Sequence, residues 1–273
     1  MTNIKRWIYT SDWHIPYLCS GFYDWFLDQV RHYKPDIVVL GGDQLDAVVL
    51  SKYSHSAEDT TPLHEDYAQL NDSLHGARVA CQNEGKDTEF VFLLGNHEDR
   101  IEQAWISKNL RPLLHWNAHQ ETILPELKHW KQVPYAVYRK NNRHRVGQVT
   151  WIHGWEVAKN KLNAQAVEQG VENGLVVSGH IHRADENVVQ LEAFGDCMLP
   201  YYRVSCGMGM AYENAEYMRA KRQLMVNWTQ SIVVGEVKAT KSPRRAKDWD
   251  AHPVFYSVAH RGNRCGINNR SVA

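Results

Sequence analysis

Residues 91–99 read Val-Phe-Leu-Leu-Gly-Asn-His-Glu-Asp, an apolar run that ends abruptly in glycine and then in side chains able to bind metals or transfer protons. A buried strand that stops in this way delivers its polar residues to the rim of a sheet. The same arrangement recurs in four more apolar runs, which end at residues 12–14, 43–46, 153–154 and 180–182. Five strands that all end in Asp, Asn or His exceed what a structural core needs, so the pattern predicts a functional site at a sheet edge.

The segments between these runs predict a layered α/β fold in the first half of the chain. Unbroken apolar runs are typical of strands covered on both faces, and apolar residues spaced three and four apart predict helices between them. A strand–helix–strand order implies parallel strands joined by right-handed crossovers. The expected order is strand 6–10, helix 21–33, strand 36–40, a loop or short helix at 48–61, helix 62–83, strand 89–94 and helix 98–109.

The second half predicts a hairpin and then a second sheet. Strands at 135–139 and 148–153 are expected to pair across the basic turn at 140–145. Three later segments have strand character without a long helix between the first two, which predicts an antiparallel second sheet. These segments are residues 187–193, 201–205 and 232–237. The remaining expectations are a helix at 156–170, a strand at 175–178, a helix at 213–225 and a late strand at 254–258. Residues 110–133, which are rich in Trp, His and Pro, are not assigned to a helix or strand.

The bulk properties favour a protein of the cytoplasm. The chain has 273 residues, 43% apolar content and a formal net charge of zero, which allows one large domain or two small ones and excludes a globally basic or acidic protein. Five cysteines without a CxxC pair indicate reduced thiols rather than a disulfide framework. The first residues lack a charged and apolar leader, and no run approaches the ~18 apolar residues of a membrane span. We therefore expect a soluble cytoplasmic protein without a membrane partner.

Charge is distributed unevenly along the chain. Residues 238–273 carry eight Lys or Arg against two Asp, so this stretch is about +6 and the remainder about −6. The excess of carboxylates in the remainder fits a cation site, and the basic end either meets phosphate or is a solvated tail. We expect residues 1–237 to form the main domain and residues 238–273 to form a basic extension that packs on it or trails from it.

Seven side chains at the ends of the apolar runs are candidate metal ligands. They are Asp12, His14, Asp43, Asn96, His153, His180 and His182. Oxygen and imidazole ligands without thiolate suit borderline divalent ions. Each residue alone could be a turn former or a packed histidine, but seven together are too many for one ion and fit two, which is the usual arrangement for phosphoryl chemistry. We expect two divalent ions, with Mn placed ahead of Fe, Zn, Co and Ni.

The same positions resemble the five signature blocks of the calcineurin-like metallophosphoesterase superfamily. The blocks are Asp12-x-His14, Gly42-Asp43-x-x-Asp46, Gly95-Asn96-His97-Glu98, His153 and Gly179-His180-x-His182. Their order and spread match, although no single block would suffice alone. The run Gly-Asn-His-Glu-Asp-Arg at 95–100, with Leu-Ser-Lys after the second block, resembles the branch often found in phages and prophages. The resemblance implies a four-layer fold, a two-sheet β-sandwich flanked by helices, and a host-cytoplasmic location if the chain is phage-encoded.

The resemblance also implies a role for each ligand. The two ions would be held by Asp12, His14 and His182 and by Asn96, His153 and His180, with Asp43 as the bridge. His97 would not be a ligand; it would orient the substrate phosphate and protonate the leaving group. Asp46 would hydrogen-bond His97 and fix its orientation, as a carboxylate does for other catalytic imidazoles.

One departure from the family pattern bears on the substrate. The protein-phosphatase branch has Arg-Gly directly after the second block, where this chain has Ala47 and Val48. Arg100 and Arg183, each just after a block, either grip phosphate in its place or form surface salt bridges. Trp13 and Trp155 flank predicted ligands and either belong to the core or line the substrate cleft.

Three functions follow from these residues. The leading one is a phosphodiesterase that hydrolyses a phosphoester substrate, DNA, RNA or a nucleotide, by attack of a metal-bridging hydroxide. The alternatives are a phosphomonoesterase acting on a small metabolite or a phosphoprotein, and a metal-bound scaffold without catalysis. The sequence predicts neither the physiological substrate nor the oligomeric state.

Overall fold

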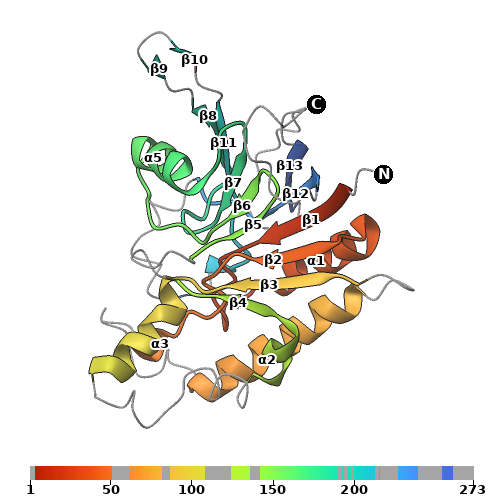
Figure 1. Ribbon diagram of the computed structural model, residues 1–273. Helices are drawn as coiled ribbons and strands as arrows, with labels where there is room; N and C mark the ends of the chain where they lie inside the picture. The colour runs from red at the N-terminus through yellow and green to blue at the C-terminus, as the bar shows by residue number, and fades with distance from the viewer. Residues whose placement is uncertain are drawn as a thin grey trace.

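The computed structural model describes residues 4–50, 62–81, 87–107, 124–135, 142–189, 192–193, 196–197, 200–212, 215, 227–238 and 254–260. Two β-sheets pack face to face in this part of the chain, and helices cover the outer face of each sheet (Figure 1). Apolar side chains fill the interface between the sheets and the interfaces between sheets and helices. The predicted α/β class, a two-sheet sandwich flanked by helices, is confirmed.

The first sheet has six strands in the order β13-β12-β1-β2-β3-β4. Their bounds are β1 Ile4–Thr10, β2 Ile37–Leu40, β3 Glu89–Leu93, β4 Lys131–Val133, β12 Ser231–Lys238 and β13 Val254–Ala259. Strands β1 to β4 are parallel, whereas β12 is antiparallel to both β1 and β13. Because β1, β2 and β3 are parallel, the residues that follow them emerge at the same edge of the sheet.

The second sheet has five strands in the order β5-β6-β7-β11-β8. Their bounds are β5 His144–Val146, β6 Val149–Trp151, β7 Leu175–Ser178, β8 Asp185–Val189 and β11 Tyr201–Ser205. Strands β6, β7 and β11 are parallel, and the two edge strands are antiparallel to their neighbours. A small ribbon of β9 Glu192–Ala193 and β10 Asp196–Cys197 projects beyond β8 (Figure 1).

Helices cover the sheets where the apolar periodicity predicts them. The helical segments are α1 Ser20–Tyr33, η1 Val48–Leu50, α2 Leu63–Ala80, α3 Asn96–Ser107, η4 Pro125–His129 and α5 Lys159–Gln169. Helix α1 buries Phe22, Phe26 and Val30, which recur at intervals of four residues on one face. Among the helices described, none combines the length and apolar character that a membrane crossing requires.

Side-chain alternation explains the apolar runs at residues 7–9 of β1 and 232–234 of β12. In β1, Trp7 and Tyr9 point between the two sheets, while Ile8 points toward α1 and α2. In β12, Val233 points between the sheets and Ile232 points toward the helices. A strand buried on both faces has no polar side, and this makes a continuous apolar run.

Two strand predictions were wrong. Residues 232–237 do not join the second sheet; they belong to β12, which pairs with β1 from Ile4 opposite Lys238 to Tyr9 opposite Val233. The antiparallel partner of β6 is β5, which begins inside the predicted basic turn. The chain reverses at Gly147, whose φ of 55° suits a tight hairpin.

The late strand is found as predicted, and other predictions fall on residues that the structure does not describe. The late strand is confirmed as β13, so part of the predicted basic extension is an edge strand of the first sheet. In residues 110–133, η4 and β4 occupy positions that the sequence left unassigned. Residues 136–139 of the predicted hairpin strand and nearly all of the predicted helix 213–225 lie outside the described residues.

Candidate metal centre

The predicted ligands converge at the carboxyl edge of the two sheets, although they come from distant parts of the chain. Their sources are the loop after β1 for Asp12 and His14, the loop after β2 for Asp43, the start of α3 for Asn96, the loop after β6 for His153 and the loop after β7 for His180 and His182. Parallel strands bring their carboxyl ends together, so the topology produces this convergence.

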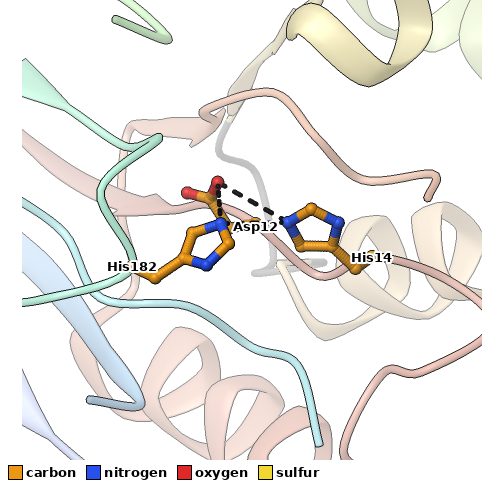
Figure 2. A group of neighbouring side chains, drawn as sticks. All are labelled: Asp12, His14 and His182. Atoms are coloured by element: carbon orange, nitrogen blue, oxygen red, sulfur yellow. Dashed lines mark hydrogen bonds and ion pairs between the residues drawn. The ribbon is translucent and has the colours of Figure 1, made fainter. Parts of the chain in front are cut away.

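A first cluster comprises Asp12, His14 and His182 (Figure 2). The Nε2 atom of His182 lies 3.2 Å from Asp12 Oδ1 and 3.1 Å from the Nε2 atom of His14. Asp12 is fully buried, and its Oδ1 atom accepts no hydrogen bond. Two imidazole nitrogens and an unsatisfied carboxylate oxygen that face one point form a donor set suited to a divalent cation.

A second cluster comprises Asp43, His153 and His180, with Asn96 beside it. The Nε2 atom of His153 lies 3.3 Å from Asp43 Oδ2 and 3.1 Å from Asn96 Oδ1. The other ring nitrogen of His153 donates to the carbonyl of Gly41 at 2.7 Å, which turns Nε2 toward the cluster. These residues therefore also fit a metal ion.

The two clusters adjoin through Asp43. A carboxylate oxygen of Asp43 lies within 4.8 Å of ring nitrogens of both His14 and His97, and it belongs to the group with His153 and His180 as well. Burial raises the pKa of Asp43, but the imidazoles of His153 and His97 outweigh burial and hold this pKa well below its usual value. Asp43 is thus a buried carboxylate that stays ionised between imidazoles of both clusters.

Charged groups in both clusters shift one another's pKa in the same way. Burial raises the pKa of Asp12, but the neighbouring His182 offsets this effect and lowers the pKa to about 2. Burial lowers the pKa of His153, yet Asp43 outweighs burial and raises this pKa to about 9. Each carboxylate is paired with positive charge, which a bound cation would also supply.

The backbone at these residues is strained. Left-handed φ values occur at five predicted ligands: Asp12 (57°), His14 (49°), Asp43 (52°), His180 (72°) and His182 (58°). Only three other non-glycine residues in the described part of the chain share this conformation. Residues without a glycine's freedom rarely adopt it, and such strain gathers at functional sites. The concentration of strain at this edge is independent support for a functional site.

His97 lies beside the clusters and is held by Asp46. The Nδ1 atom of His97 is 2.8 Å from Asp46 Oδ1, and the Nδ1 atom of His14 is 3.5 Å from the same oxygen. Burial lowers the pKa of His97, but Asp43 and Asp46 outweigh burial and raise it. The backbone N–H of His97 also donates to Asp43 Oδ1 at 2.8 Å. Asp46 therefore orients one imidazole of the first cluster and the adjacent His97.

The two candidate phosphate-binding arginines differ in position. Arg100 reaches the site, since its Nη2 atom lies 3.0 Å from His97 Nε2. Arg183 instead donates to the carbonyl of Val157 at 3.4 Å. Trp13 is fully buried and donates to Thr10 Oγ1 at 3.0 Å, so it belongs to the core and does not line a cleft.

Sequence reasoning missed the contribution of Glu98. Its carboxylate accepts hydrogen bonds from the backbone N–H groups of Asp43, Gln44, Leu45 and Gly95 at 2.7–3.0 Å. The bond to Gly95 has a sequence signal, because a Glu at the third position of a helix often bonds back to the N-cap residue. The three bonds to the loop after β2 have no such signal, because that loop is distant in sequence.

Comparison with known proteins gives similarity to solved structures alone. No protein-family model and no curated protein matches the chain. It is similar to a conserved uncharacterized protein, a predicted phosphoesterase, from Streptococcus pneumoniae (11% identity, TM-score 0.35, covering 95% of this chain and 91% of that one). It is similar to Vacuolar Protein Sorting 29 from Cryptosporidium parvum (13% identity, TM-score 0.39, covering 96% of this chain and 94% of that one). It is also similar to the E. coli phosphoesterase YfcE (13% identity, TM-score 0.36, covering 86% of this chain and 100% of that one). Similarities at this level assign neither a family nor an activity to the chain.

Proposed function

We propose that the protein is a metal-dependent phosphoesterase that hydrolyses phosphodiester bonds in DNA, RNA or nucleotides. The observation that carries the proposal is the pair of adjoining ligand clusters joined through Asp43. Two divalent ions held there, with Mn favoured, would polarise the ester oxygen and lower the pKa of water at the site. The five sequence blocks support membership of the calcineurin-like metallophosphoesterases and of their phage-type branch, and with it a cytoplasmic location.

The residues beside the clusters supply positioning and proton transfer. His97 is oriented through Nδ1 by Asp46, so its Nε2 atom is turned toward Arg100. In this role His97 protonates the leaving oxygen, and Arg100 binds a phosphate oxygen. His97 keeps 12% of its side-chain surface exposed, whereas Asp43 and Asp46 keep 2%, so the imidazole lies on the side that substrate reaches.

The preference for diesters rests on the uncharged residue that follows Asp46. This residue, Ala47, is buried, so the loop itself contributes no guanidinium here. A phosphomonoester carries nearly two negative charges at neutral pH and a diester carries one, so fewer cations favour the diester. The position of Arg100 favours the second candidate, a phosphomonoesterase. Its guanidinium lies beside His97 and supplies a positive charge that a doubly charged monoester would use.

The test compares hydrolysis of bis-p-nitrophenyl phosphate with hydrolysis of p-nitrophenyl phosphate in the presence of Mn²⁺. We expect a higher kcat/KM for the diester. A higher value for the monoester would assign the site to phosphomonoesters. Protein that binds two metal ions but hydrolyses neither compound would instead be a scaffold.

A further inference from the structure

The candidate metal centre opens to solvent on one side. Asp12, Asp43 and His14 keep at most 2% of their side-chain surface exposed. His97 keeps 12% and His182 keeps 15%. Asn96 and His180 are also only half-buried. A substrate therefore approaches the clusters from the side of these partly exposed residues, and a residue that packs against His182 borders this entrance.

Trp228 is such a residue. Its ring centre lies 4.4 Å from that of His182, and the two rings are nearly perpendicular at 76°. Tyr212 lies edge-on to Trp228 at 6.1 Å, and both half-buried rings pack over Met208 and Met210. Aromatic rings with a methionine layer beneath them form an apolar surface next to the metal ligands.

Backbone hydrogen bonds hold this surface in place. The N–H of Thr229 donates to the carbonyl of His182 at 3.0 Å, and the hydroxyl of Thr229 accepts from Ala184 at 2.9 Å. Gln230 donates from its side chain to the carbonyl of Met210 at 3.1 Å. Trp228 is thus fixed relative to His182, and a preformed platform loses little entropy when a ligand binds.

Packing alone does not explain the exposed part of Trp228. Trp13, a core tryptophan near the same edge, is fully buried and bonds through its Nε1 atom to Thr10. Trp228 is only half-buried, and its ring borders that of His182. A partly exposed tryptophan beside a catalytic centre fits contact with a planar group of a ligand.

A second aromatic side chain borders the other cluster. The ring of Tyr135 lies 5.6 Å from that of His153 at 73°, and Tyr135 is also half-buried. Each cluster therefore has one half-buried aromatic ring against one of its imidazoles. A phosphodiester has two substituents on its phosphorus, and the two rings offer one contact surface beside each cluster.

From this arrangement we propose that Trp228 is a specificity residue that stacks on the nucleobase of a phosphodiester substrate. The proposal rests on the phosphoesterase function proposed above, because it assigns the substrate class of the same site. Base–aromatic stacking changes affinity by about 5- to 150-fold per base, and it tolerates any base because every base has a π-face. The substrate class is a nucleotide diester read by its planar bases.

The experiment uses two diesters with the same leaving group, thymidine 5′-p-nitrophenyl phosphate and methyl p-nitrophenyl phosphate. The ratio of their kcat/KM values isolates the contribution of the nucleoside. We expect the wild type to prefer the thymidine compound and Trp228→Ala to reduce the ratio about 10-fold, mainly through KM, while Trp228→Phe keeps most of it. Tyr256→Ala, which changes an aromatic residue 56% exposed on β13, is the matched control and should leave the ratio intact.

Each outcome separates the two proposals. An unchanged ratio in Trp228→Ala, or a wild type without preference, overturns the role of Trp228 while leaving a phosphodiesterase. An equal loss on both diesters with lost metal also overturns it, because Trp228 would then only support His182. Failure of the wild type, with metal bound, to cleave either compound overturns the proposed function itself.

Discussion

The carboxylate of Glu98 fixes the backbone of Asp43, since Glu98 Oε2 accepts a hydrogen bond from the N–H of Asp43 at 3.0 Å. Glu98 Oε1 accepts two more from Gln44 and Leu45 at 2.7 and 2.9 Å. Glu98 is itself buried, and Asp43 has a left-handed φ of 52°. Four backbone donors to one carboxylate, with Gly95 as the fourth, offset the cost of holding the loop in this conformation.

We expect Glu98→Gln to lower both stability and metal affinity. The amide that replaces Oε1 or Oε2 presents N–H groups to backbone N–H groups, which leaves donors unsatisfied and costs about 1–3 kcal/mol. Urea unfolding measures the first effect, and calorimetric titration with Mn²⁺ measures the second. Glu168→Gln, on the exposed face of α5, is the control. Unchanged Mn²⁺ affinity in Glu98→Gln would contradict the coupling of Glu98 to the metal site.

His97→Ala should reduce turnover of the diester by about 10²- to 10⁴-fold, the usual contribution of a positioned general acid. Bound metal should stay close to the wild-type amount, because His97 is assigned no ligand role. Turnover with bis-p-nitrophenyl phosphate and metal analysis of the purified variant check the two statements. His129→Ala, at an exposed position of η4, is the control. Full activity in His97→Ala would show that the role assigned to His97 is wrong.

Asp43→Ala should lose bound metal. Asp43 is the carboxylate that adjoins imidazoles of both clusters, so its removal affects both proposed ions. We expect the stoichiometry of bound Mn²⁺ to fall from about two to one or fewer. Asp28→Ala, which removes a carboxylate 71% exposed on α1, should retain both. Two ions bound with wild-type affinity in Asp43→Ala would rule out the bridging role.

The sequence predicted the edge of the sheets where the site lies, because each apolar run and its polar end are local features. Pairing between distant strands is not local, and β12 was placed in the wrong sheet because a strand apolar on both faces fits either one. The contacts of Glu98 with the loop after β2, and of Trp228 with His182, depend on the same long-range topology. The candidate ligands were readable from the sequence, whereas the contacts made by Glu98 and Trp228 were not.

His144 should make stability depend on pH in the weakly acidic range. It is buried against Trp151, and burial, with Lys131 nearby, lowers its pKa to about 4. The unfolded chain binds this proton near pH 6.5, so the folded state loses stability as the pH falls from 6.5 to 4. Between pH 7.5 and pH 5 we expect a loss of about 1–2 kcal/mol from this residue.

Urea unfolding at the two pH values measures this loss. His144→Phe keeps an aromatic ring against Trp151 and removes the titrating group, so the difference between the two pH values should shrink. His32→Gln, at an exposed position of α1, is the control and should behave as the wild type. The same pH dependence in His144→Phe and wild type would assign the effect to other histidines.

Neutralising the basic extension should weaken binding of an oligonucleotide. The segment between β12 and β13 carries Lys241, Arg244, Arg245 and Lys247, and phosphate contacts make affinity depend on salt. Truncation would be a poor test, because β13 pairs with β12 along six residues of the first sheet and its loss would destabilise the fold. Replacing the four basic residues by Gln leaves β13 in place. We expect the slope of log K against log salt for single-stranded DNA to fall by up to about 3, measured by fluorescence anisotropy. An unchanged slope, or no binding by the wild type at low salt, would show that this segment does not contact nucleic acid.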